Sequence, residues 1–198
     1  MGIMFAGSGR TSTALTYLFY AISRPENTTI QSRLRGEVRS LPDGDMLALR
    51  NNLYINAVIK ETFRVYPTII STLPRTVASK IQVEDLTIPA GTFVGIQVYV
   101  HHRDPSVFPE PDMFRPERRL ESTKEMDLSL TPFSLGKHIC IGQNLAWEEL
   151  YLAVEALMRR GFTLRLGKEM KNGDMEMEDR FNIAPRGRRL ILEVILHS

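Results

Sequence analysis

The sequence predicts a mainly α-helical fold with small β-sheets, in the α+β class. Three long segments, residues 2–23, 47–65 and 145–158, carry apolar residues at the three-to-four-residue spacing of an α-helix. Shorter apolar runs bounded by turn residues follow the second segment and recur near the C-terminus, which is typical of strands. Since the 198 residues contain no internal repeat, linker or low-complexity stretch, we expect these elements to share one core.

Composition and charge single out no special class of protein or partner. The chain is 43% hydrophobic and 24% charged, with a formal net charge of +2, as in ordinary globular proteins. The one short basic group, at residues 186–189, is too brief to indicate nucleic-acid binding, and no nucleic-acid partner is expected. The sequence has no run of about 18 apolar residues, so it predicts no membrane-spanning helix.

The N-terminal part of the chain is expected to form helices. The first, residues 2–23, has a broad apolar face and ends before Pro25, because proline cannot continue a helix. A second helix is predicted at 30–38. The third, 47–65, carries apolar residues four apart on one face and is ended by Pro67.

Strands are expected in the middle of the chain and in its tail. Residues 80–83 and 92–100 flank a Pro-Ala-Gly sequence at 89–91, which predicts a hairpin that turns there. Two further strands are predicted at 162–166 and 190–196, joined by a charged, methionine-rich connector.

Cys140 is the only cysteine of the chain, so it cannot form an internal disulfide and serves either packing or chemistry. It follows a proline-rich segment at 103–134, predicted to be a long ordered loop, and comes just before the helix at 145–158. Unpaired N–H groups and the dipole of that helix favour a thiolate, the form that binds metals. Gly136 and Gly142 flank the cysteine at a spacing that suits a tight loop with positive φ. The alternative is an inert, buried cysteine.

The order Phe133-x-x-Gly136-x-x-x-Cys140-x-Gly142 resembles the haem-binding loop of cytochrome P450. In that family the cysteine thiolate is the axial ligand of the haem iron. The resemblance therefore implies haem b, iron protoporphyrin IX, with Cys140 as the metal ligand and Phe133, Gly136 and Gly142 around it. His138 takes the place of the basic residue that reaches a haem propionate.

A second motif lies on the third predicted helix. Glu61 and Arg64 are three residues apart, share a helix face and match the Glu-x-x-Arg of the family. The resemblance adds Arg118, from a Pro-Glu-Arg segment, as the third member of a buried triad that supports the cysteine loop and has no catalytic role. Outside this context, a lone Glu-x-x-Arg is usually a surface ion pair of little energetic value.

A third motif, Leu73-Pro74-Arg75, resembles the strand that passes beside the haem in the family. It implies that Arg75 binds a propionate, for which a guanidinium fork is well suited. Residues 69–73 and the chain near residues 182–183 would face the substrate in the family. Their apolar or small side chains imply a hydrophobic substrate, although ordinary core packing explains the same pattern.

The first predicted helix departs from the family pattern. The family places an acid and a threonine there, which help to deliver protons to bound oxygen. This chain has Gly9 and Arg10 at those positions, and only Thr11, to which the resemblance assigns a catalytic role, matches. Arg10 would either bind a carboxylate or a peroxide, or be a solvated residue.

Taken together, the motifs imply a partial cytochrome P450 fold, in which residues 1–198 form the C-terminal portion of the domain. The expected activity is that of a haem-thiolate monooxygenase, which inserts one oxygen atom from O2 into a hydrophobic small molecule. Electrons would come from NADPH-cytochrome P450 reductase or another donor, and the full-length family is expected at the endoplasmic reticulum membrane. The loop is most similar to those of fungal P450s of secondary metabolism. A truncated or inactive remnant, a haem-binding module without turnover and a peroxide-driven enzyme are the alternatives.

Overall fold

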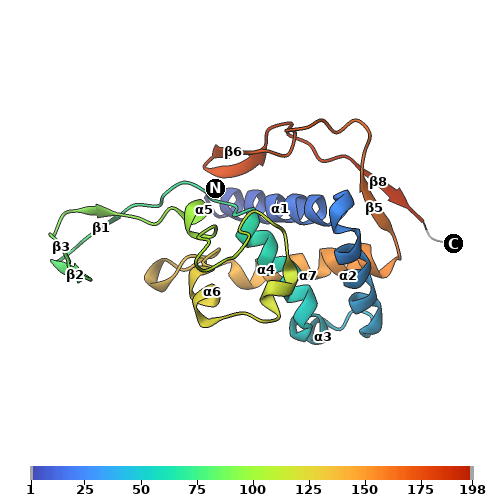
Figure 1. The fold of residues 1–198 in the computed structure, drawn as a ribbon, viewed down its shortest axis with the longest axis horizontal. Helices are drawn as coiled ribbons and strands as arrows, with labels where there is room; N and C mark the ends of the chain where they lie inside the picture. The colour runs from blue at the N-terminus through green and yellow to red at the C-terminus, as the bar shows by residue number, and fades with distance from the viewer. Residues whose placement is uncertain (1, 197–198) are drawn as a thin grey trace.

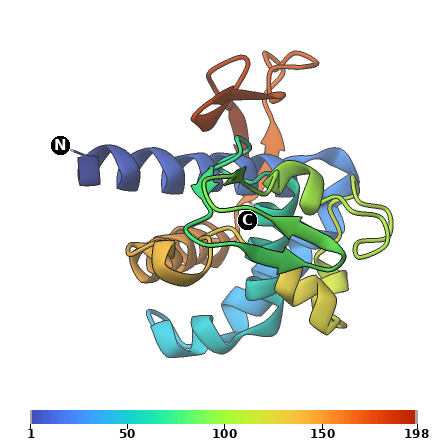
Figure 2. The same ribbon diagram turned by 90° about the vertical axis from the view of Figure 1, so that its left-hand side faces the viewer.

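The structure is a computed structural model that describes residues 2–196, with side chains described for residue 7 and from residue 9 onward. Its body is built from long helices that pack side by side (Figure 1). These are α1 (Gly2–Ser23), α2 (Thr28–Ser40), α4 (Leu53–Val65) and α7 (Gln143–Arg159). Figure 2 shows α1 running past the other helices at its N-terminal end. Within residues 2–196, no helix combines the length and apolar character needed to cross a bilayer.

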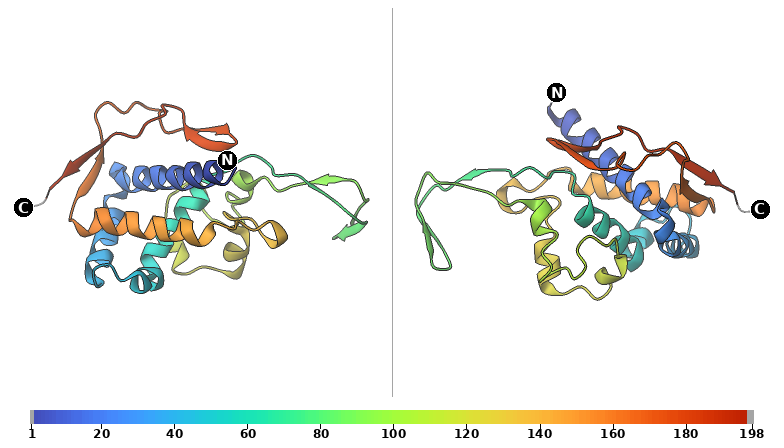
Figure 3. Two further views of the ribbon diagram at one scale, coloured as in Figure 1. Left: turned by 180° about the vertical axis from the view of Figure 1, so that it is seen from behind. Right: turned by 45° about the horizontal axis from the view of Figure 1, so that its top comes forward.

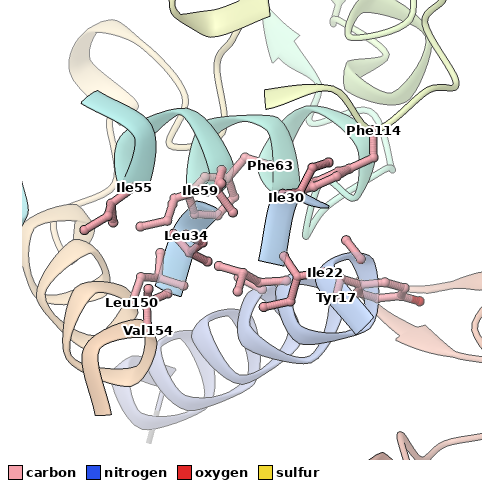
Figure 4. Packing of buried hydrophobic residues seen from close by; sticks show 14 of the residues in the cluster. Tyr17, Ile22, Ile30, Leu34, Ile55, Ile59, Phe63, Phe114, Leu150 and Val154 are labelled. Atoms are coloured by element: carbon pink, nitrogen blue, oxygen red, sulfur yellow. The ribbon is translucent and has the colours of Figure 1, made fainter. Parts of the chain in front are cut away.

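The core lies where α1, α2, α4 and α7 meet (Figure 4). Each helix contributes one apolar face, as the spacing of its residues predicts. The core side chains that are at most 1% exposed include Leu18, Ile22, Leu34, Ile55, Ile59, Leu150 and Val154. This core confirms the mainly α-helical class.

The helix predicted at 47–65 is two helices in the structure, α3 (Met46–Asn51) and α4. The division falls at Asn52, whose extended backbone leaves the helical path. Its side chain accepts a 2.9 Å hydrogen bond from the backbone N–H of Ile55. Asparagine is among the best N-cap residues, so it starts a new helix here although the apolar periodicity continues across it.

The strands of residues 2–196 pair antiparallel in two-stranded sheets. As predicted, the tail contains a pair, β5 (Thr163–Leu166) with β8 (Leu192–Ile195). The connector between them contains a further hairpin that the sequence did not indicate, β6 (Met177–Arg180) with β7 (Asn182–Pro185). Its turn residue Phe181 has φ 72°, a conformation that gives no glycine signal here.

The prediction of a hairpin turning at 89–91 is wrong. The hairpin joins β2 (Ile81–Val83) to β3 (Leu86–Ile88) through Glu84, which takes φ 50° without being a glycine. Residues 89–91 lead instead into β4 (Phe93–Val94), which pairs with β1 (Arg75–Thr76). Residues 98–100 are helical, in α5 (Val98–His101). Strands β1 to β4 form an arm that extends away from the helices (Figures 1 and 3).

The segment at 103–134 is ordered, as expected of a long loop with a structural role. It contains two short helical turns, η2 (Pro116–Arg119) and α6 (Lys124–Ser129), which sequence periodicity did not reveal. The first of these packs directly against α4. The segment thereby connects the buried side of α4 to the cysteine loop that follows it.

Candidate cofactor-binding site

The loop from Phe133 to Gly142, called here the cysteine loop, folds back on itself before α7 begins. Its middle is the short turn η3 (Gly136–His138), and Gly136 has φ 67°, as the sequence predicted. The backbone N–H of Cys140 then donates a 2.8 Å hydrogen bond to the carbonyl of Phe133. This bond closes the loop, so the sulfur is presented from a fixed backbone just ahead of the helix.

Gly142 does not have the role that the sequence suggested. Its φ is −90°, which any residue can adopt, so positive φ does not explain a glycine there. It is instead the N-cap of α7, and its carbonyl accepts a hydrogen bond from Ala146. A Cβ at this position would lie 4.0 Å from the Cys140 sulfur, an ordinary contact. Gly142 thus lies next to the sulfur but is not strained.

We expect Gly136→Ala to lower the free energy of unfolding by about 1–2 kcal/mol, the usual penalty of a left-handed backbone for an L-residue. A Cβ there would meet no atom within 4 Å, so the penalty is conformational and not steric. Urea unfolding followed by circular dichroism measures it. The matched control is Gly36→Ala inside α2, also with open space around it, which should raise stability by about 0.5–1 kcal/mol. Equal signs for the two variants would contradict the assignment.

Exposed apolar side chains surround the cysteine. Cys140 itself is a free, half-buried thiol, while Leu135 is 67%, Ile139 43% and Ile141 91% exposed. His138 is exposed at the end of η3. Apolar surface of this kind is usually covered by a partner or a ligand. The loop therefore suits a flat apolar group that binds the thiol and carries negative charge at its edge.

The donor set around Cys140 limits which metal could bind. Over residues 2–196, no cluster of three or more His, Cys, Asp or Glu side chains could hold a metal ion. A metal bound at this single sulfur must therefore bring most of its ligands with it. The iron of a porphyrin does so, since the ring supplies four nitrogen ligands and the protein one axial ligand.

An aromatic cluster holds the start of the cysteine loop against the helices. The ring of Phe133 packs edge to face against Phe63 of α4, with centroids 5.3 Å apart, and lies 6.1 Å from Trp147 of α7. Phe63 and Trp147 are themselves 5.8 Å apart and near perpendicular. Edge-to-face pairs of this kind add to the stabilisation from burial. The three rings thus connect α4, α7 and the loop.

The predicted triad is formed, and it is buried. The Glu61 carboxylate accepts hydrogen bonds from Arg64 Nε at 3.0 Å and Nη2 at 2.8 Å, and from Arg118 Nε at 2.9 Å. The three side chains are at most 3% exposed. This geometry excludes the surface ion pair considered for Glu61 and Arg64, because all three charges are removed from water.

The two arginines also fix the backbone of the segment that precedes the cysteine loop. All remaining N–H groups of Arg64 donate to carbonyls, at 2.5–3.0 Å. Arg118 donates three further hydrogen bonds to carbonyls, at 2.6–3.3 Å. The acceptors are the carbonyls of His102, Pro109, Glu110, Pro111 and Met113. A planar, five-donor side chain suits this role, which lysine could not fill.

Arg119 is a fourth charged member of the cluster that sequence reasoning missed. Its side chain is 1% exposed, and its Nε lies 3.8 Å from the Glu61 carboxylate. Among the described residues, neither its Nε nor its Nη2 has a hydrogen-bond partner. Burial lowers the pKa of Arg119 to about 10, although Glu61 opposes the shift. The only signal in the sequence was its position beside Arg118. The cluster therefore has three guanidinium groups for one carboxylate.

Gly9 and Arg10, the residues of α1 that differ from the family pattern, lie against the turn between β6 and β7. Arg10 Nε donates a 3.1 Å hydrogen bond to Asn182 Oδ1, and its guanidinium lies 5.6 Å from the ring of Phe181. A Cβ at Gly9 would come within 2.9 Å of the Asn182 side chain. Arg10 is thus anchored to the β6–β7 turn and is not simply solvated. The small residue at position 9 leaves room for that contact.

The remaining predicted site residues come from other elements. Thr11 is half-buried on α1, which packs against α7. Arg75 is exposed on the arm, and its Nη1 donates to the carbonyls of Leu73 and Pro74. The structure thus brings Phe133, Gly136, His138, Cys140 and Gly142 together in one loop. The roles of Thr11 and Arg75 stay predictions.

Comparison with known proteins gives consistent matches. The sequence model described as "Cytochrome P450" matches residues 1–192. The chain is 35% identical to the cytochrome P450 monooxygenase orf2 of Aspergillus niger over 95% of this chain and 39% of that protein. It is 38% identical to the cytochrome P450 monooxygenase tazI of Aspergillus terreus, over 98% and 40%. It is also 35% identical to the N-acetyltryptophan 6-hydroxylase ivoC of Emericella nidulans, over 96% and 39%. The chain thus spans about two fifths of the length of these relatives.

Proposed function

The chain belongs to the cytochrome P450 family, and from this premise we propose that it is the C-terminal, haem-binding portion of a haem-thiolate monooxygenase domain. The observation that carries the proposal is the half-buried, free thiol of Cys140, on a loop that follows a fully buried Glu61–Arg64–Arg118 triad in the chain. The cofactor is haem b, with Cys140 as its axial ligand. Haem bound through a thiolate supplies oxygen activation and favours O–O cleavage.

The residues of this chain would bind and orient the cofactor. Leu135, Ile139 and Ile141 supply exposed apolar surface for the porphyrin face. His138 and Arg75 are the basic residues proposed for the propionates, since both side chains are exposed. Phe133 backs the loop from the protein side.

The proposed reaction is insertion of one oxygen atom from O2 into a hydrophobic small molecule, with electrons from NADPH-cytochrome P450 reductase or another donor. Thr11 is the proposed proton-delivering hydroxyl, because it is the matching residue of the family motif on α1. The fungal relatives, one of them named as a hydroxylase of N-acetyltryptophan, favour a substrate from secondary metabolism. Location at the endoplasmic reticulum membrane is proposed by family alone.

A second candidate is favoured by one specific observation. Gly9 and Arg10 replace the acid and the threonine of the family, and Arg10 is tied to Asn182. A haem-binding chain without reductase-driven turnover, whether an inactive remnant or a binding module, is consistent with this exchange. Turnover with reductase and NADPH would support the monooxygenase, whereas turnover with peroxide alone would indicate a peroxide-driven enzyme.

The decisive test is Cys140→Ser. The unaltered chain, expressed with haem available, should bind haem and give the red-shifted band of a thiolate-ligated iron when it is reduced and exposed to carbon monoxide. Cys140→Ser should lose that band completely and keep its helical circular dichroism, because a hydroxyl is a poor iron ligand and the cysteine is outside the core.

Leu152→Ser is the control, since it puts the same side chain at a 51% exposed position of α7 and leaves the cysteine loop and its thiol in place. It should keep the thiolate band. A Cys140→Ser protein with an unchanged band, or an unaltered chain that takes up no haem, would contradict the proposal.

A further inference from the structure

His102 is a buried histidine that the proposed function does not use. It immediately follows α5 and is 0% exposed. It lies between the charged cluster on α4 and the segment that leads into the cysteine loop, with a hydrogen bond to each. Since its ring is bonded to one element and its backbone carbonyl to another, this buried histidine is placed to transmit the position of one element to the other.

The hydrogen bond between the His102 ring and Thr131 determines which ring nitrogen carries the proton. Nε2 accepts a 3.2 Å hydrogen bond from the backbone N–H of Thr131, so Nε2 carries no proton and the ring proton is on Nδ1. Burial, followed by the nearby charges of His101, Arg119 and Arg64, lowers the pKa of His102 to about 3. An interaction with the Phe63 backbone acts in the opposite direction and outweighs the effect of either arginine, but not that of burial. The ring is therefore neutral near pH 7.

On its other side, His102 is held by the triad. Its backbone carbonyl accepts a 3.0 Å hydrogen bond from Arg64 Nη1. Arg64 is itself fixed by Glu61 at two nitrogen atoms. The backbone of His102, from which the imidazole projects, is thus held by the fully buried Glu61–Arg64 pair.

Thr131 connects the ring of His102 to the backbone of the cysteine loop. Its carbonyl accepts a 3.2 Å hydrogen bond from Ser134, which has φ 62° and begins the reversal of the chain. Between them, Phe133 accepts the hydrogen bond that closes the loop at Cys140. The ring of His102 is therefore three hydrogen bonds from the backbone of the cysteine.

We propose that His102 is a positioning residue for the thiolate: its neutral imidazole fixes Thr131 and thereby the direction in which Cys140 presents its sulfur to haem. This inference rests on the proposed function for its haem part. The link from His102 to the loop rests on the geometry of the chain alone.

The test compares His102→Leu with His102→Gln. Leucine fills a similar volume without an acceptor, whereas the amide oxygen of glutamine can accept from Thr131 in place of Nε2. Hydrogen exchange is measured on the chain without haem, and the reduced carbon monoxide spectrum on the chain with haem. In His102→Leu, exchange of the amides in residues 131–140 should rise about tenfold, as expected for loss of one buried hydrogen bond. The thiolate band should fall by about half or more, while His102→Gln stays within about twofold of the unaltered chain in both measurements.

His101→Leu is the control. His101 is the last residue of α5, directly before His102, and is half-buried. The ring that accepts from Thr131 is that of His102 and not that of His101. His101→Leu should leave exchange in the loop unchanged. Unchanged exchange in a folded His102→Leu, or equal loosening in His102→Gln, overturns the inference. If His102→Leu does not fold, the exchange of His102→Gln decides alone. An unaltered chain without a thiolate band would reject the proposed function, while the exchange result would still decide the link.

Discussion

Glu61→Ala is expected to lower the free energy of unfolding by about 3–5 kcal/mol, the loss typical when one member of a buried charge cluster is removed. The variant would leave Arg64 and Arg118 without their carboxylate, and Arg119 without its nearest one, in a site at most 3% exposed. Total stabilities of domains are about 5–15 kcal/mol, so the loss is a large fraction of the total. Haem incorporation should be lost with it. Urea unfolding followed by circular dichroism, and the haem-to-protein ratio, measure the two effects.

Two controls separate this effect from the loss of any carboxylate. Glu110→Ala removes a partner of Arg115 from an exposed ion pair in the same segment, and should change stability by less than about 1 kcal/mol. Combining Glu61→Ala with Arg119→Met should recover part of the loss, because one of the three unpaired buried cations is then removed. If Glu61→Ala retained haem and its free energy of unfolding fell by less than about 1 kcal/mol, the cluster would not be what stabilises the cysteine loop.

Apart from Arg118, which the family resemblance supplied, the parts of the site that sequence reasoning predicted are those determined by local spacing. Glu61 and Arg64 share a helix face because they are three residues apart, and the structure pairs them. The cysteine loop is likewise a local motif, whose Gly136 takes the positive φ that its residue type suggests. Such features depend on neighbours in the chain and need no knowledge of the tertiary fold.

The features that sequence reasoning missed depend on distant contacts or on unusual backbone. Arg10 is 172 residues from its partner Asn182, so no pattern in α1 could reveal that contact. Glu84 and Phe181 turn their hairpins with positive φ although neither is a glycine. For this reason the sequence prediction placed the turn of the β2–β3 hairpin at the wrong residues and did not include the β6–β7 hairpin. Asn52 divided a helix whose apolar period continued, because capping and periodicity gave opposing signals.

Acid should destabilise the chain through His102, and the sign follows from its pKa. The folded value is about 3, below the ordinary value of 6.5, because burial and the charges of His101, Arg119 and Arg64 disfavour the imidazolium. Between these two values the unfolded chain binds a proton that the folded chain does not. Stability is therefore complete above about pH 6.5 and falls as the pH drops towards 3. At about 1.4 kcal/mol per pKa unit, the loss reaches roughly 4 kcal/mol, a large fraction of the ~5–15 kcal/mol that is typical of a domain.

The comparison with His102→Gln isolates this contribution, because glutamine does not titrate while the carboxylates titrate alike in both proteins. The unfolding free energies of the two proteins are measured in urea at half-unit steps from pH 7.5 to 4. As the pH falls, the value for the unaltered chain should decrease more than the value for His102→Gln. Parallel curves for His102→Gln would mean that the folded chain accepts the proton. A protonated imidazole can no longer accept the hydrogen bond from the Thr131 N–H. The same neutral ring therefore determines both the stability of the fold in acid and the geometry of the cysteine loop.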